Sequence, residues 1–466
     1  MTTDRSRMNI APVCLFDPDD PPKYPSRAEC EALFTRILKM TRGGGDTTVW
    51  VFGSWSGNLR WARNRLTTPG DVRDVSVRIS RVIRGAPGDA STNRMDDEAL
   101  RRAVENAESL AQYRGENPDA NSPPGKQYYL ATHTWSDATS TLDERARSEL
   151  ARRLVIPSLS AGLLQAGYLN ATITTRAVFN TEGMAAYQSI TRASYSVTVR
   201  NAKGTGSGWA GASHYDWSRI DPDAVTARAQ AKCVSSSQPK TIEPGRYTVI
   251  LEPQAVAELM QNVVSALDRP AAESMPTPFT LKPGQSKIGV KMFDSRVEIG
   301  TDPTDPDGGY IAFDWDGFPF RPVKWVEGGI LKALSYGRDY ALEQLGEGAP
   351  LPNPMAFRMA GGTATVAEMI KSTDRGLLVT RFGGVTVVDN ETLLTTGVTR
   401  DGVWLIEDGV IKFAVKNFRF SDSPLFVLNK IEQMGVPEQV FSPYDPYIVP
   451  ALKVRDFNFT SLADAV

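Results

Sequence analysis

Apolar residues recur along this chain with two different periods, and these periods predict where helices and strands lie. Between residues 254 and 267 the spacing is helical, and the apolar positions are Val256, Leu259, Met260, Val263, Val264 and Leu267. The opposite face carries Gln254, Glu258, Gln261, Asn262 and Ser265. We therefore expect an amphipathic helix that packs one face against a core.

The polar face of this helix is rich in amides, whereas surface helices usually carry Lys, Arg and Glu. Uncharged amides suit a shielded cavity or an interface, and they are also compatible with a face turned to solvent. The sequence leaves both interpretations open. The candidate cavity or interface residues are Glu258, Gln261, Asn262 and Ser265.

The first half of the chain mixes helical and strand patterns. Helices are expected at 27–41, at 95–112 after Asp96 or Asp97 as N-cap, at 143–166 with an interruption at Pro157, and from Asp221 to Cys233. Strands, including a hairpin or meander, are expected at 47–53, 59–67, 72–83, 168–183 and 190–211.

Strand patterns dominate the second half. Strands are expected at 286–295, 309–317, 375–390 and 402–420, and short helices at 340–345, 365–372 and 426–435. The predicted fold class is α+β, with a helix-containing N-terminal domain followed by a β-rich C-terminal domain. The predicted boundaries are an extension 1–27, domains 28–245 and 246–450, and a tail 451–466.

Composition narrows the class of protein. The 466 residues are 41% hydrophobic and 23% charged with a net charge of -2, which argues against nucleic acid as the main partner. No apolar run is long enough to span a membrane, and the N-terminus lacks the apolar stretch of a signal peptide. A cytoplasmic protein is expected.

Metal-ligating residue types are scarce. Cys14, Cys30 and Cys233 have no CxxC spacing, so they support neither a disulfide framework nor a thiolate zinc site. His133 and His214 are the only histidines, whereas a zinc catalyst needs about three protein ligands. No pair of histidines on one helix face is possible.

Four local features suggest a binding or catalytic site, and each also has a simpler structural interpretation. DPTDPDGG at 302–309 suggests calcium, but its Asp-Pro and Asp-Gly pairs are ordinary turn formers. GTGSGWAG at 204–211 lacks the features of a phosphate loop, so a tight hairpin or close packing is preferred. His214 with Asp216 could form an acid-base or metal pair, although a histidine beside a carboxylate is common without function. Cys233 is expected to be a buried structural thiol.

An ordered series of motifs carries a resemblance to a known family. The clearest are RYTVILEP at 246–253, the stretch 310–331, GGTATVAEMIKSTDRGLLVTR at 361–381 and the stretch 397–420. LRWARNRLT at 59–67, residues 92–111, FNTEG and residues 195–211 agree more loosely. From about residue 28 to 450 the chain resembles the TldD/PmbA family of metallopeptidases.

The resemblance implies a zinc motif that this chain lacks. In the catalytic branch, the helix after the VILEP-like strand bears His-Glu-x-x-x-His, whose histidines bind zinc and whose Glu activates water. Aligned on VILEP, these positions fall on Gln261, Asn262 and Ala266. The branch also uses a Cys ligand near its C-terminal end, and here no Cys follows Cys233.

The chain therefore resembles the PmbA (TldE) branch, which lacks the motif. This implies a non-catalytic subunit that holds no cofactor, pairs with a zinc-bearing TldD-like subunit and encloses a cavity for unfolded or precursor peptides. Gln261, Asn262, Ser265 and Glu258 would line that cavity or the interface. One alternative is a self-associating scaffold or binding protein without a protease partner, possible as a homodimer. Another is a repurposed enzyme that uses His214 or the acidic clusters with a different metal.

Overall fold

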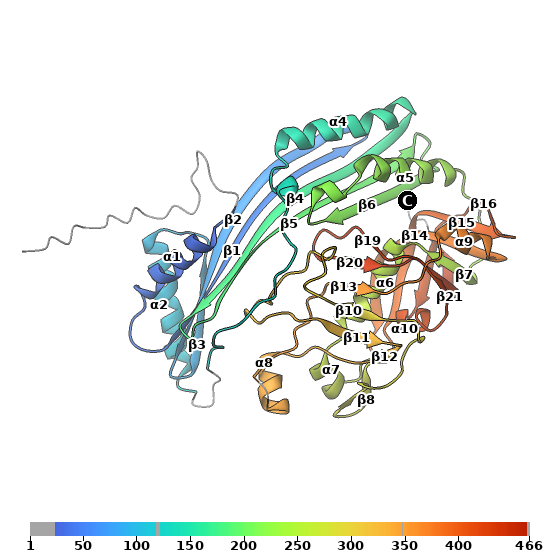
Figure 1. Ribbon diagram of the computed structural model, residues 1–466. Helices are drawn as coiled ribbons and strands as arrows, with labels where there is room; N and C mark the ends of the chain where they lie inside the picture. The colour runs from blue at the N-terminus through green and yellow to red at the C-terminus, as the bar shows by residue number, and fades with distance from the viewer. Residues whose placement is uncertain (1–23, 118–121, 347, 464–466) are drawn as a thin grey trace, which may run out of the picture.

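A computed structural model describes residues 24–117, 122–346 and 348–463. A long curved sheet from the first half arches over a strand-rich second half (Figure 1). The α+β class, with helices concentrated in the first half, is confirmed. Cys14 and most of the expected N-terminal extension lie outside the described residues.

The arching sheet is antiparallel and has the strand order β3-β2-β1-β4-β5-β6 within the described residues. Its strands are β1 Asp46–Ala62, β2 Arg65–Ile83, β3 Ala86–Thr92, β4 Leu163–Asn180, β5 Ala185–Asn201 and β6 Ser207–His214. The hairpin expected in the first half is confirmed, and the expected strand 47–53 lies within β1. The expected strand 59–67 is not one strand, because it spans the end of β1, the turn and the start of β2. Arg63 and Asn64, both with positive φ, make its turn.

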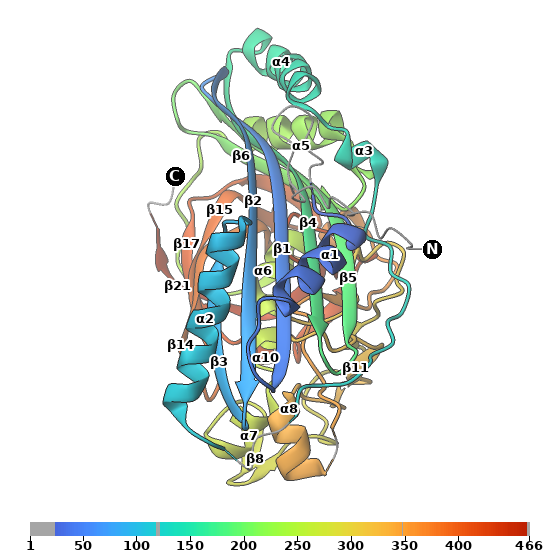
Figure 2. The same ribbon diagram turned by 90° about the vertical axis from the view of Figure 1, so that its left-hand side faces the viewer.

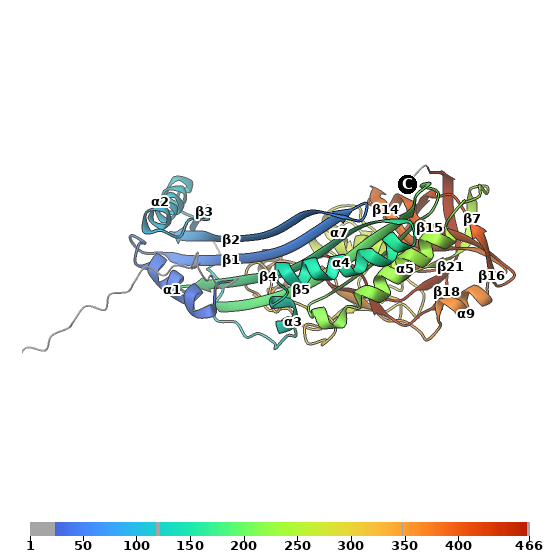
Figure 3. The ribbon, with the colours of Figure 1, turned by 90° about the horizontal axis from the view of Figure 1, so that it is seen from above.

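Four helices cover the outer, convex face of this sheet: α1 Arg27–Leu38, α2 Asp97–Arg114, α4 Glu144–Ser160 and α5 Pro222–Ser235. Figure 2 shows α2 alongside β3, and Figure 3 shows α4 and α5 side by side. They lie there because alternate residues of each strand share a face. On β1 the odd positions Val49, Val51, Trp55, Leu59 and Trp61 are buried under these helices.

Helix boundaries follow the local signals. Asp96 caps α2, and Asp221 with Pro222 begins α5 as expected. Helix α4 begins after Asp143 and passes through Pro157, but it ends at Ser160, and Leu163–Asn180 is already a strand. The expected helix 143–166 is therefore too long at its C-terminal end, where pairing with β5 decides the conformation.

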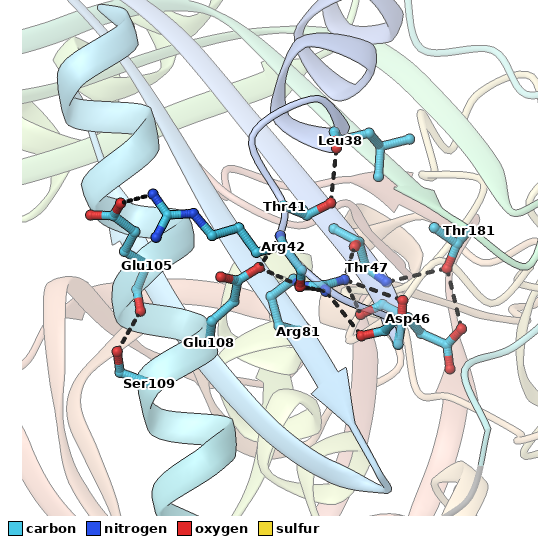
Figure 4. A network of polar contacts seen from close by, with 12 residues as sticks. Leu38, Thr41, Arg42, Asp46, Thr47, Arg81, Glu105, Glu108, Ser109 and Thr181 are labelled. Atoms are coloured by element: carbon cyan, nitrogen blue, oxygen red, sulfur yellow. Dashed lines mark hydrogen bonds and ion pairs between the residues drawn. The ribbon is translucent and has the colours of Figure 1, made fainter.

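A buried arginine joins the helices to one end of the sheet (Figure 4). Arg81 is 1% exposed, and its guanidinium donates to backbone carbonyls of residues 42–46 and forms an ion pair of 3.3 Å with Glu108 of α2. Glu108 also accepts a hydrogen bond from the backbone N–H of Arg42 at 2.7 Å. Both buried charges thus have partners from separate elements.

Two sheets make up the second half. Within the described residues one has the order β14-β7-β21-β17-β15-β16, and β14 also pairs with β15, which closes five of these strands into a ring. Its strands are β7 Gly245–Leu251, β14 Arg375–Asp389, β15 Leu394–Glu407, β16 Val410–Ala414, β17 Phe418–Asp422, β18 Ile431–Met434, which pairs with β21, and β21 Leu452–Leu462. Residues 452–462, assigned to a tail from the sequence, thus form a strand between β7 and β17.

The second of these sheets has the order β12-β11-β10-β13-β20-β19. Its short strands are β10 Ile299–Thr301, β11 Val323–Glu327, β12 Ile330–Leu331, β13 Phe357–Met359, β19 Glu438–Gln439 and β20 Tyr447–Val449, and β8 Thr280–Lys282 with β9 Gln285–Ser286 forms a separate pair. The remaining short elements are α3 Asp137–Ser140, η1 Trp217–Arg219, α7 Arg269–Ser274, α8 Arg338–Tyr340, a π-helical turn Ala341–Leu345, α9 Val366–Lys371 and α10 Pro424–Val427.

Helix α6, Pro253–Ser265, lies at the centre of the second half (Figure 1). All six apolar positions identified from the periodicity are buried in the largest hydrophobic cluster, together with side chains of both sheets. The predicted amphipathic helix is confirmed, and its apolar face is the core of this half.

Three predicted elements are wrong. Residues 426–435 are not one helix: α10 ends before Leu428, and β18 follows because residues 431–434 pair with β21. Residues 286–295 are not one strand: Ser286 ends β9, and beyond it Lys291 makes only an isolated bridge. Residues 309–317 pack irregularly on the arching sheet, where Gln188 accepts from the N–H of Ala312 at 2.7 Å. Tertiary partners override the local helix propensity of 426–435 and the local strand propensity of the other two segments.

Candidate functional site

The concave face of the arching sheet borders a cavity with a volume of 870 Å³. We call it the sheet cavity. Strand β4 presents alternate residues to it, and β1 and β5 contribute residues of the same face: Ser56, Arg60, Tyr168, Asn170, Thr172, Thr174, Arg176, Ile190 and Arg192. The other wall comes from the second half, chiefly residues 309–315, 353–356 and 441–446.

A smaller cavity of 260 Å³ lies against α6. We call it the helix cavity. Gln254, Ala257, Glu258 and Gln261 of α6 line it, and Trp209 of β6 and Arg381 of β14 lie across from them. Phe441, Pro443, Tyr444 and Asp445 line both cavities, so the two cavities share this one segment as a wall.

Glu258 is the most strongly perturbed acid in the helix cavity. Its carboxylate accepts hydrogen bonds from the backbone N–H of Phe382 at 2.5 Å and from the amide of Gln254 at 3.2 Å, and Arg381 lies 3.8 Å away. Burial raises the pKa of Glu258 to about 7, although Arg381 and the two hydrogen bonds act in the opposite direction. A carboxyl with a pKa of about 7 is partly protonated near neutral pH.

Arg381 connects the two halves of the molecule at this point. Its guanidinium lies 4.5 Å from the ring centroid of Trp209 on the arching sheet, a cation–π arrangement. It also lies 3.9 Å from Asp401, whose carboxylate accepts a hydrogen bond from Ser207 of β6 at 2.8 Å. The helix cavity is therefore built from both halves.

Family models match three stretches in chain order. They are described as PmbA/TldA metallopeptidase domain 1 at residues 52–111, central domain at 137–236 and C-terminal domain at 244–461. Together they cover most of the chain. This protein belongs to the PmbA/TldD metallopeptidase family.

Relatives of known structure share the fold of this PmbA/TldD member. TldE from Thermococcus kodakarensis superposes with a TM-score of 0.81 at 17% identity, covering 92% of this chain and 99% of that one. A Thermotoga maritima protein named as a candidate modulator of a DNA gyrase gives a TM-score of 0.79 at 19% identity, with 92% and 99% covered. These likenesses show the fold.

A curated relative adds a sequence match. The zinc metalloprotease TldD homolog of Saccharolobus solfataricus is 25% identical over 237 residues, 47% of this chain. The chain spans 51% of that protein's length.

The zinc motif of the PmbA/TldD catalytic branch can be tested against α6. The three aligned positions are Gln261, Asn262 and Ala266, which is the C-cap residue of the helix. A neutral amide is a poor zinc ligand, Asn cannot act as a general base, and Ala has no donor. These residues do not fit a zinc ion. Within the described ranges no group of three or more His, Cys, Asp or Glu side chains is placed to hold a metal.

The four candidate residues from the sequence divide into two pairs. Glu258 and Gln261 line the helix cavity. Asn262 does not, because its amide donates to the carbonyls of Glu258 at 3.2 Å and Leu259 at 3.4 Å on its own helix. Ser265 is exposed and donates to the carbonyl of Gln261 at 2.6 Å.

The two histidines do not come together. His133 is exposed before α3, and His214 is buried at the end of β6. The His214 ring accepts a hydrogen bond from the backbone N–H of Asp216 at 2.9 Å, while the Asp216 carboxylate caps η1 and accepts from Ser136. Burial lowers the pKa of His214, so the neutral ring is favoured. No His214–Asp216 side-chain pair forms.

The remaining sequence candidates have structural roles. Cys233 is buried on α5, and burial raises the pKa of its thiol. Residues 302–309 form turns as predicted, with Asp305 paired to Arg358 at 2.7 Å and Asp307 to Arg219 at 3.2 Å. The stretch 204–211 forms the β5–β6 hairpin as predicted, and Gly208 lies directly against α5.

Sequence reasoning missed the sheet cavity. The available signal was the period-two run of polar residues in β4, where Asn170, Thr172, Thr174 and Arg176 alternate with buried residues. Polar alternation is also typical of a strand that faces solvent, so the pattern alone cannot predict a cavity.

No helix in the described part of the chain has the length and apolar character needed to cross a membrane.

Proposed function

We propose that this chain is the non-catalytic, TldE-like subunit of a two-component zinc metallopeptidase that cleaves unfolded or precursor peptides. The observation that carries the proposal is the presence of Gln261, Asn262 and Ala266 at the positions where the catalytic branch has its zinc motif. The rest of the α6 environment supports it, because the helix still borders a cavity between the two halves.

The proposed role of the subunit is to shape the peptide cavity and to support its partner. The sheet cavity offers side-chain hydroxyls and amides along an extended strand, which suit the backbone of an extended peptide. Gln261 offers one further amide in the helix cavity. Zinc held by a TldD-like partner would supply the activated water for peptide hydrolysis. A cytoplasmic location belongs to the same proposal.

Native mass spectrometry of the tagged full chain, purified from its own host, tests the proposal by reporting partner mass and bound zinc together. We expect a hetero-complex that carries zinc only when the second subunit is present. A homodimer that holds stoichiometric zinc by itself contradicts the proposal, and a metal-free homodimer without a partner supports a scaffold instead.

The same complex tests the role of α6. Gln261→Ala removes an amide that lines the helix cavity, whereas Asn262→Ala removes one that binds its own helix. We expect Gln261→Ala to slow peptide processing while Asn262→Ala leaves it nearly unchanged, with assembly intact in both. Equal activity of the two variants would remove the assigned role of Gln261.

A further inference from the structure

Three arginines on neighbouring strands face the sheet cavity. Arg60 lies on β1, Arg176 on β4 and Arg192 on β5, and all three line the cavity. Arg60 is paired with Tyr168 of β4 and Arg192 with Thr172 of β4. Tyr168, Thr172 and Arg176 follow one another at intervals of four residues on the same face of β4, so the three arginines are spread in a row along the concave face. The concave face therefore forms a positively charged wall of the sheet cavity. None of its three arginines is at a position aligned with the zinc motif.

Arg192 is the buried member of this wall. Its side chain is 8% exposed, and its Nη1 atom has no hydrogen-bond partner among the described residues. An unpaired guanidinium N–H costs free energy unless a ligand or water satisfies it. Burial lowers the pKa of Arg192 to about 10, so it stays cationic at neutral pH. The side chain is thus charged and incompletely satisfied.

The other two arginines are held by aromatic rings. The Arg176 guanidinium lies 3.8 Å from the ring centroid of Trp315, and that of Arg60 lies 4.9 Å from the centroid of Tyr168. Stacking fixes the plane of a guanidinium and leaves its N–H groups free to bind a planar anion.

Two carboxylates on the facing wall act on these arginines. Asp445 influences both Arg176 and Arg192, and Asp314 influences Arg176. Burial raises the pKa of Asp314 to about 6 and also raises that of Asp445. The cavity lining carries three arginines and two carboxylates, so positive charge exceeds negative charge even when both acids are ionised.

We propose that the sheet cavity binds a carboxylate of the peptide substrate, with Arg192 and Arg176 as its anchors and Arg60 at the exposed edge. This inference rests on the proposed function. Arg binds carboxylates through two parallel hydrogen bonds, and a ligand carboxylate satisfies Nη1 of Arg192. The volume of 870 Å³ accommodates a short peptide segment.

The carboxylate that binds this site can belong to the C-terminus of a peptide or to an Asp or Glu side chain. Fluorescence anisotropy with the full chain separates these sources. The probes are one labelled flexible peptide as a free acid, the same peptide as a C-terminal amide, and the amide with an internal Glu. We expect the free acid to bind at least about tenfold more tightly than the plain amide. Tight binding of the internal-Glu amide assigns the site to a side chain as well.

Substitutions test whether the difference in affinity between the free acid and the amide depends on the arginines of the sheet cavity. Arg192→Met and Arg176→Met should abolish the difference between acid and amide, and Asp445→Asn should increase it because a competing carboxylate is lost. Arg73→Met is the matched control, since Arg73 is exposed on β2 and shares the convex face with its partner Trp55. If Arg192→Met fails to fold, as judged by its circular dichroism, Arg176→Met and Arg60→Met carry the test.

The outcomes separate this inference from the proposed function. Equal affinity of acid and amides, unchanged in Arg192→Met, overturns the carboxylate site while leaving peptide binding in place. Loss of the acid–amide difference in Arg73→Met also overturns it, because the effect would then follow net charge. Absence of binding by every peptide overturns both proposals.

Discussion

At the scale of single residues, the groups that surround a buried side chain decide whether it is ionised. Arg81 and Glu108 are both buried and satisfy each other across two elements. Glu258 is also shielded, but its arginine lies 3.8 Å away and is shared with Asp401. The first pair stabilises the fold, whereas the second group has a pKa near neutrality.

Replacing Arg81 by Met is expected to destabilise the protein by about 3–5 kcal/mol, because Glu108 would then be buried without its cation. The matched control is Arg42→Met, which breaks the exposed pair with Glu105 and should cost at most about 1 kcal/mol. Chemical denaturation of both variants measures the free energies of unfolding. Similar losses would show that the Arg81 pair has no special role.

Glu258 is expected to make the free energy of unfolding decrease as the pH rises. Its folded-state pKa of about 7 exceeds the ordinary value of 4.5, so between these values the folded state holds a proton that the unfolded state has lost. Its contribution is full below pH 4.5 and is lost as the pH rises through 7, a difference on the order of 3 kcal/mol.

Glu258→Gln should remove this slope. Urea unfolding between pH 5 and 8, plotted as wild type minus variant, is expected to decline with rising pH. The control is Glu391→Gln at an exposed position of the β14–β15 turn region. A flat difference for Glu258→Gln, matching that control, would contradict the perturbed carboxyl.

At the scale of elements, close approach of backbones fixes how helices lie on the arching sheet. Gly208 of β6 allows α5 to contact the strand, since a Cβ there would lie 2.2 Å from the carbonyl oxygen of Ala229 and 2.3 Å from the N of Cys233. Neither backbone atom can move without displacing the helix.

Gly208→Ala should therefore destabilise the protein by about 3 kcal/mol or more. Gly44→Ala is the control, because a Cβ at Gly44 meets nothing within 4 Å and its φ is not positive. We expect the control to stay within about 0.5 kcal/mol of wild type. Thermal unfolding of the two variants makes the comparison, and equal melting temperatures would show that α5 can shift freely.

At the scale of the whole molecule, the candidate sites lie where the two halves meet. The arching sheet supplies a polar, arginine-bearing wall, and the second half supplies α6 and residues 441–446. Neither half alone lines the sheet cavity or the helix cavity. A hydrogen bond of 2.8 Å from the Trp50 ring N–H to the Trp315 carbonyl, and the contact of Arg381 with Trp209, hold the halves in this arrangement.

The sequence by itself determined the amphipathic α6, the capped helices α2 and α5, the α+β class and the absence of any histidine after His214, because each follows from a local pattern or from residue identities. Only the tertiary structure decided that Asn262 binds its own helix and that Gln261 and Glu258 face a cavity. It also brought Arg60, Arg176 and Arg192 to one wall. These outcomes depend on strand register and on contacts between distant segments, which local periodicity does not encode.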